Sequence, residues 1–200
     1  MTLAGYEVFA IIGFLFAAYA VIANDSIQTL GTFLASNSHR PWWVLWLFAA
    51  GIMVAALLFQ LFYGGDIADG KLNKLPYPEG GIKWWHALPP LVLLFLTRFG
   101  IPVSTTFLVL TVFALSGGAE TDGVMTKMLI KSLTGYVVAF ATGALIWLAI
   151  SRIWEGWVGR TRDDDERLHP IWTLFQWSTT GFLWWTWLLQ DFANIFVFLP

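Results

Sequence analysis

The chain has 200 residues, of which 58% are hydrophobic and 12% are charged, whereas about a quarter of the residues of a soluble domain are charged. Thirteen Trp and seventeen Phe add the aromatic residues that gather at membrane interfaces. This composition indicates an all-α polytopic membrane protein. The net charge of −2 says nothing about partners, and no segment resembles a basic nucleic-acid-binding face. The absence of Cys excludes disulfides, thiolate metal sites and Cys nucleophiles.

Four stretches of the sequence predict transmembrane helices, each of which needs about 20 mainly apolar residues. They are residues 5–23, 42–62, 127–150 and 170–189, the last continuing towards the C-terminus. The first stretch lacks a positively charged flank, which favours a retained span over a signal peptide. Residues 151–169 form the most charged segment, and we expect them to be a solvated linker loop.

Residues 84–116 are apolar too, but Gly and Pro interrupt them at Gly100-Ile101-Pro102. The two halves are each too short to cross a bilayer comfortably. Two half-length helices predict a re-entrant hairpin, which enters and leaves the membrane on the same side. Non-helical backbone at membrane depth is tolerated only against protein or a water-filled cavity, which is where transporters bind their substrates.

Three consecutive hydroxyl side chains, those of Ser104, Thr105 and Thr106, follow this break in the hairpin. If Pro102 opens the second half-helix, the next backbone N–H groups, beginning with that of Val103, are free to bind a ligand. Together with the hydroxyls and the helix dipole they would form an anion site that contains no cation. A second interpretation stays open, in which Ser and Thr only cap the helix or bond across helices.

An acidic residue, Asp25, stands at the end of the first predicted span. A carboxylate inside a span costs about 2.5–3.5 kcal/mol on insertion scales, so such a residue indicates a functional site. With Asn24, Gln28 and Thr29 it offers the hard oxygen ligands that a small cation or a proton would use. If residue 25 already lies at the membrane–water interface, a charged side chain there costs little free energy and does not indicate a functional site.

These segments resemble the signatures of the inorganic phosphate transporter (PiT) family. That family carries a Gly-Ala-Asn-Asp-x-Ala-Asn motif in each of two inverted halves, and a Pro-Val-Ser-Thr-Thr-His loop. The Pro-Val-Ser-Thr-Thr run within a broken hairpin is the most specific of the matching features. The matching stretches are Ala23-Asn24-Asp25-Ser26-Ile27-Gln28, Gly100-Ile101-Pro102-Val103-Ser104-Thr105-Thr106 and Gln190-Asp191-Phe192-Ala193-Asn194.

The resemblance implies a symporter of inorganic phosphate, coupled to Na⁺ or H⁺, in the cell membrane. Residues 1–150 would be the first repeat of an inverted-repeat transporter, and residues 170–200 the start of the second. Phosphate would be bound by Ser104, Thr105 and Thr106. The cation would be coordinated by Asp25, Gln28, Asp191 and Asn194.

Several alternatives remain open. The sequence departs from the family pattern at Ile22, Gln28, Phe107 and Gln190, so sulfate or another small oxyanion is an alternative cargo. A structural membrane subunit that transports nothing is a further alternative. We expect no enzymatic activity, because the three His residues are scattered and no nucleophile–base set is present, and no cofactor other than Na⁺ as the coupling ion. We also expect the chain to be the N-terminal part of a longer transporter, or else to associate as a homodimer in the lipid bilayer.

The order of the spans predicts how two of the helices are oriented. The spans 5–23 and 42–62 cross and return, the hairpin makes no net crossing, and the span 127–150 crosses again. The helix that begins at residue 170 should therefore run antiparallel to the first helix. This orientation would bring Asp25 and Asp191 towards one site from opposite directions.

Overall fold

The computed structural model describes residues 2–3, 6–64, 67, 70, 72–75, 77–101, 103–116, 122–161 and 170–199. Within these residues the protein is almost wholly helical, with one antiparallel pair of two-residue strands before the first helix. The strands are β1 (Thr2–Leu3) and β2 (Tyr6–Glu7). The α-helices are α1 (Val8–Ser36), α2 (Trp42–Phe59), α3 (Leu88–Arg98), α4 (Thr105–Ser116), α5 (Asp122–Thr161) and α6 (Pro170–Phe196). Short π- and 3₁₀-helical turns are η1 (Gln60–Gly64), η2 (Leu72–Lys74) and η3 (Trp84–Ala87).

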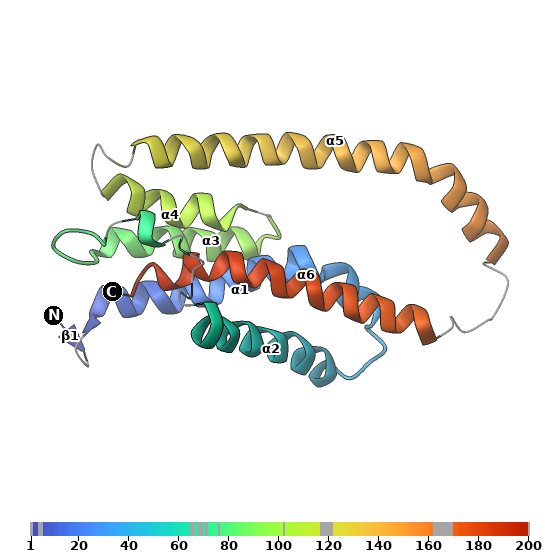
Figure 1. The fold of residues 1–200 in the computed structure, drawn as a ribbon, viewed down its shortest axis with the longest axis horizontal. Helices are drawn as coiled ribbons and strands as arrows, with labels where there is room; N and C mark the ends of the chain where they lie inside the picture. Colours follow the sequence, from blue (N-terminus) through green and yellow to red (C-terminus); the bar gives the residue numbers. More distant parts are fainter. Residues whose placement is uncertain are drawn as a thin grey trace.

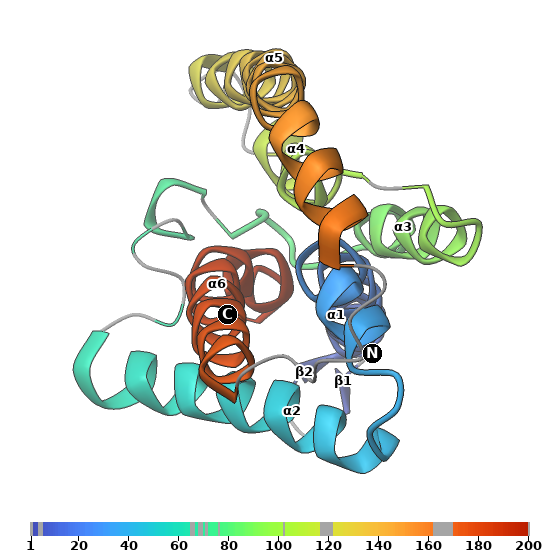
Figure 2. The ribbon, with the colours of Figure 1, turned by 90° about the vertical axis from the view of Figure 1, so that its right-hand side faces the viewer.

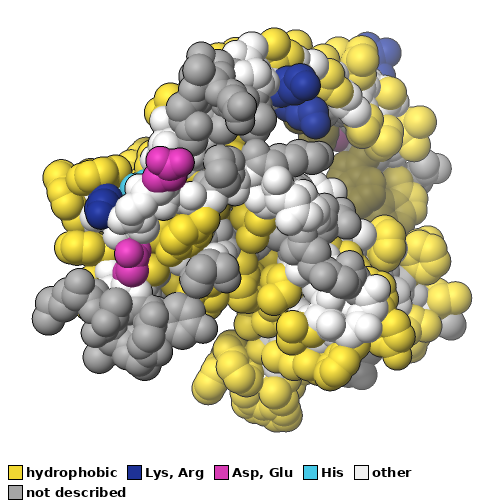
Figure 3. Space-filling view, turned by 60° about the vertical axis from the view of Figure 1, so that its left-hand side comes forward, with side chains coloured by type: hydrophobic (Ala, Val, Ile, Leu, Met, Phe, Trp, Pro, Cys, Tyr) yellow, Lys and Arg dark blue, Asp and Glu magenta, His cyan; other side chains and the backbone are white. Residues whose placement is uncertain are grey.

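Three of the described helices are long and apolar enough to cross a membrane, as expected for an integral membrane protein. They cover Val8–Ser36, Trp42–Tyr63 and Thr126–Trp157. The fourth predicted span lies in α6, a helix of 27 residues that mixes aromatic with polar side chains and is not among these three. Hydrophobic side chains are spread widely over the face drawn in Figure 3, with few charged ones among them.

The helices are arranged in layers around a central pair (Figures 1 and 2). Helices α1 and α6 lie side by side in the middle, with α2 below them and the α3–α4 pair above them in both views. Helix α5 forms the outermost layer, beside α4. Because apolar side chains are buried between the layers, the polar segments of α1 and α6 are brought together at the centre.

Helices α1 and α6 are antiparallel, which confirms the orientation predicted from the order of the spans (Figure 1). Near the end of α1 and the start of α6, Gln176 donates a hydrogen bond to Ser36 Oγ at 2.7 Å. At the other end of the pair, the rings of Phe14 and Phe196 pack edge to face with centroids 5.8 Å apart. The first half of α6 therefore faces the second half of α1.

The predicted hairpin is present as two short helices. Helix α3 ends at Arg98, and Gly100 has a φ of 70°, a left-handed conformation that a residue with a Cβ adopts at a cost. Helix α4 begins at Thr105, and its end returns to the start of the hairpin, where His86 Nε2 lies 3.0 Å from Ser116 Oγ. Pro102, which was expected to open the second half-helix, lies outside the described residues.

Two helices extend beyond the limits that the sequence suggests. Helix α1 continues to Ser36, so Asp25 lies well inside a helix and not at its end. Helix α5 continues to Thr161, so residues 151–161 of the expected linker loop are helical, whereas residues 162–169 lie outside the described residues. Polar or charged side chains lower the hydropathy at these places but do not interrupt backbone hydrogen bonding, which in a helix is internal to the segment.

The core has two parts, one on each side of the central pair. The first lies between α1, the hairpin and the C-terminal turn, where Phe113 and Phe198 are buried with ring centroids 5.0 Å apart. The second lies between α1, α2 and α6, and its largest member is Trp184, whose indole N–H donates to the Ala49 carbonyl at 3.1 Å. The polar site described next lies where the hairpin meets α1 and α6.

Candidate functional site

A pocket of about 540 Å³ lies between α1, the hairpin tip, α5 and α6. The tip contributes the residues from Val103 to Thr106, and α1 contributes Asp25 and Gln28. Its other lining residues are Lys131, Ser132, Gly135, Tyr136 and Ala139 of α5, and Thr186, Trp187, Gln190 and Asp191 of α6. Segments more than 150 residues apart in the sequence thus share one pocket.

The hairpin tip is bound to α1 by amide side chains. Asn24 Nδ2 donates to the carbonyl oxygen of Val103 at 3.1 Å, and the N–H of Val103 donates back to Asn24 Oδ1 at 3.4 Å. Gln28 Nε2 donates to the same carbonyl oxygen at 3.4 Å. The N–H of Val103, expected to face an anion, is therefore directed at Asn24, and both amides of α1 hold the tip in place.

The start of α4 is bound to α6. Asn194 Nδ2 lies 3.1 Å from Thr105 Oγ1 and 3.2 Å from Thr106 Oγ1, and the Thr106 hydroxyl donates to Asp191 Oδ1 at 3.3 Å. Ser104 Oγ accepts the N–H of Phe107 at 3.3 Å, which is an N-cap bond and leaves the hydroxyl proton of Ser104 available. Hydroxyls predicted to bind an anion thus lie beside an acid and an amide predicted to bind a cation.

The two acids of the repeated pattern meet in the pocket. The carboxyl groups of Asp25 and Asp191 lie within hydrogen-bonding reach of each other. Asp25, which is 2% exposed, also accepts a hydrogen bond from Asn24 Nδ2 at 3.0 Å, and the Trp187 side chain lies beside it in the pocket. Two carboxylates this close repel strongly, so they either share a proton or hold a cation between them.

Asn194 has an oxygen atom that is available for a ligand. The side chain is completely buried, and its Oδ1 has no hydrogen-bond partner within the part of the chain that the structure describes. A buried polar atom without a partner costs about 1–3 kcal/mol, so this oxygen could accept a hydrogen bond or bind a cation without losing an existing bond. A carbonyl oxygen is a ligand that hard cations such as Na⁺ accept.

Of the six predicted cation ligands, Asp25, Gln28 and Asp191 line the pocket, whereas Asn24, Asn194 and Thr29 do not, and Thr29 makes no bond to a described side chain of the pocket. Its hydroxyl donates to the backbone carbonyl of Asp25 at 2.6 Å, a bond to the preceding turn of α1. Asn24 and Asn194 are joined to the pocket by hydrogen bonds to residues that line it, Val103 and Thr105.

Sequence reasoning missed the wall of the pocket that α5 supplies. Lys131, Ser132 and Tyr136 come from a helix that was expected only to span the membrane. A signal was available, because a Lys inside an apolar helix is costly and usually has a function. What the sequence did not reveal is the direction in which this helix faces.

Comparisons of the chain with protein-family models, with curated proteins and with solved structures found no match. The resemblance to phosphate transporters therefore depends on the motif residues, six of which line this one pocket: Asp25, the run from Val103 to Thr106, and Asp191.

Proposed function

We propose that this protein is a secondary transporter, or a part of one, that carries phosphate or a similar inorganic oxyanion together with Na⁺ or H⁺ through the cell membrane. The observation that carries the proposal is the meeting of a hydroxyl-rich broken hairpin with two carboxylates in one pocket, between antiparallel helices. Transporter sites commonly lie at such breaks, where helix ends and unwound backbone meet polar side chains.

The hairpin tip is the part of the pocket that suits an oxyanion. It presents the side chains of Ser104, Thr105 and Thr106 at the start of α4, where the helix dipole is positive. An oxyanion with several acceptor oxygens can take a hydrogen bond from each hydroxyl. The hydroxyls of Thr105 and Thr106 now contact Asn194 and Asp191, so they would reorient when an anion binds.

The carboxylates are the part of the pocket that suits a cation. Alone, Asp25 and Asp191 would repel a bound oxyanion through their charge. A Na⁺ ion or a proton between them halves their net charge and so reduces that repulsion, and the free Oδ1 of Asn194 offers a further ligand. Cation binding then favours anion binding and, by reciprocity, the anion favours the cation, which is the coupling that a symporter needs.

The test is uptake of radiolabelled phosphate and sulfate into liposomes that contain the purified protein, with Na⁺ and pH gradients imposed separately. We expect one of the two gradients to drive accumulation of one of the anions. Thr106→Val should abolish the uptake, since Thr106 contacts both halves of the site. If the protein neither takes up nor binds any oxyanion, the result would instead favour a structural subunit whose polar residues only join helices.

A further inference from the structure

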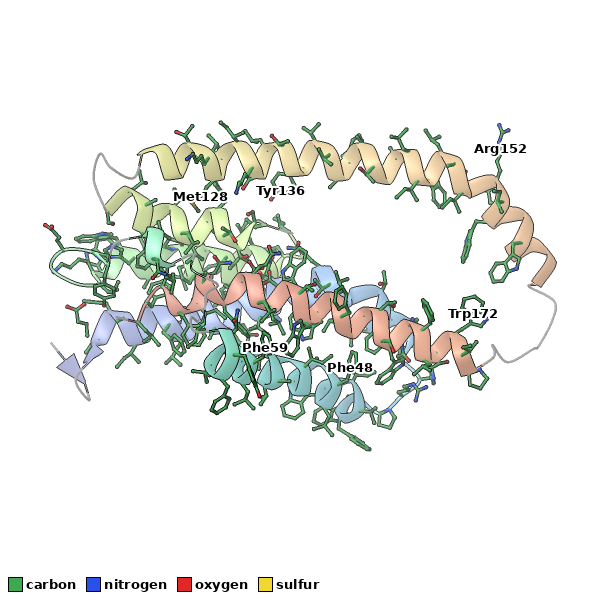
Figure 4. The ribbon with its side chains drawn as sticks, in the orientation of Figure 1. Phe48, Phe59, Met128, Tyr136, Arg152 and Trp172 are labelled. Carbon is green, nitrogen blue, oxygen red and sulfur yellow. The ribbon has the colours of Figure 1, made fainter. Side chains whose placement is uncertain are left out.

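Lys131 lines the pocket from α5, on the same helix face as the small residues Gly135 and Ala139. Lys131, Gly135 and Ala139 all line the pocket, and their spacing of four places them on one face of α5. Tyr136 on the same wall projects from α5 towards the other helices (Figure 4). Lys131 lies nine residues into α5, about 14 Å along its axis from the first residue.

The charge of Lys131 has no ion-pair partner among the described residues. Two acids line the same pocket, Asp25 from α1 and Asp191 from α6, but their carboxyl groups are close to each other and already accept hydrogen bonds from Asn24, Thr106 and Asn194. An ammonium group within an apolar helix is costly without a counter-charge. The hydroxyl side chains at the start of α4, which carry no charge, line the same pocket as Lys131.

A monovalent and a divalent anion differ in what this pocket must supply. Hydroxyl groups and a helix start offer partial positive charge, which suits either anion. A second full negative charge, held close to Asp25 and Asp191, needs a full positive charge near it to offset the repulsion. Among the described residues that line the pocket, Lys131 is the one that carries such a charge.

We propose that Lys131 contacts the anion held at Ser104, Thr105 and Thr106 and makes the pocket selective for doubly charged tetrahedral oxyanions over singly charged ones. This inference rests on the proposed function, because it assigns the charge of the cargo at the same site. It also gives α5 a role in binding, in addition to crossing the membrane.

The test compares sulfate and perchlorate, which are both tetrahedral and differ in charge. Each anion competes with radiolabelled phosphate for the purified full chain in lipid nanodiscs at saturating Na⁺. For the unchanged protein we expect sulfate to displace phosphate at a much lower concentration than perchlorate does. Lys131→Met should lower the affinity for sulfate about 10- to 100-fold, which corresponds to the loss of one charged hydrogen bond. The affinity for perchlorate should change by less than about threefold.

Two further variants separate charge from packing. Lys131→Arg keeps the positive charge and should keep the preference for sulfate. Lys127→Met removes a Lys one turn earlier on α5, outside the pocket lining, and should leave the affinity for both anions unchanged. If Lys131→Met weakens the binding of sulfate and perchlorate equally, or leaves the preference for sulfate unaltered, the assignment of Lys131 is overturned. If the unchanged protein retains no phosphate at all, the proposed function fails instead.

Discussion

Asn24 and Val103, 79 residues apart in the chain, exchange two hydrogen bonds. The side-chain amide of Asn24 pairs with the backbone of Val103 as a neighbouring strand would, and it thereby satisfies the N–H and the carbonyl of a non-helical residue. Backbone groups that leave a helix must find partners within the protein when no water is available. The pair therefore explains how α1 supports a broken helix at the centre of this fold.

Replacing Asn24 tests this support. Asn24→Leu introduces an apolar side chain of similar size and leaves two backbone groups of Val103 without their partner. We expect the free energy of unfolding to fall by about 1–3 kcal/mol, since Asn24 is buried. Thermal unfolding in detergent would measure it. Gln28→Leu is the matched control, because Gln28 is exposed and its single bond to Val103 is 3.4 Å long, so its loss should cost less.

Thr105→Val tests the anion site while keeping the shape of the side chain. A hydrogen bond to a charged group is worth about 1.5–3 kcal/mol, so oxyanion affinity should fall about 10- to 150-fold in equilibrium binding. Thr111→Val is the control on the same helix, since its hydroxyl bonds to the Phe107 carbonyl and does not line the pocket. Unchanged oxyanion affinity in a folded Thr105→Val protein would show that the Thr105 hydroxyl does not bind the anion.

Asp25→Asn tests the cation site. In the unchanged protein a cation should relieve the repulsion between Asp25 and Asp191, so Na⁺ or acid should raise the unfolding temperature. Asn at position 25 removes one of the two charges, so the variant should be nearly insensitive to the cation, and anion uptake should lose its dependence on the gradient. If the variant keeps that dependence and only its anion selectivity changes, the roles assigned to the acid and the hydroxyls are reversed.

Two glycines of α1 test how the C-terminal turn packs. A Cβ at Gly13 would lie 2.3 Å from the buried ring of Phe198, so Gly13→Ala must displace that ring and should destabilise the protein by about 1–3 kcal/mol. A Cβ at Gly31 would meet nothing within 4 Å, and Gly31→Ala should stabilise the helix by about 0.5–1 kcal/mol. Unfolding measurements that give the same sign for both would contradict the packing of Phe198 on α1.

The sequence by itself determined the elements that depend on local chemistry. Apolar stretches of sufficient length fixed the membrane-like helices, and Gly100 fixed the break in the hairpin, because both properties belong to neighbouring residues. The order of the spans also fixed the antiparallel orientation of α1 and α6, since each crossing reverses the direction of the chain.

Tertiary structure alone decided which polar groups meet. The rotation of each helix about its axis is set by packing against its neighbours, and it directs Lys131 of α5 into the pocket while the Thr29 hydroxyl bonds within α1. It also places the N–H of Val103 against Asn24, away from the anion role that its position after a Pro suggests. These relationships join residues of different helices, and a local sequence pattern carries no information about the partner that a side chain will face.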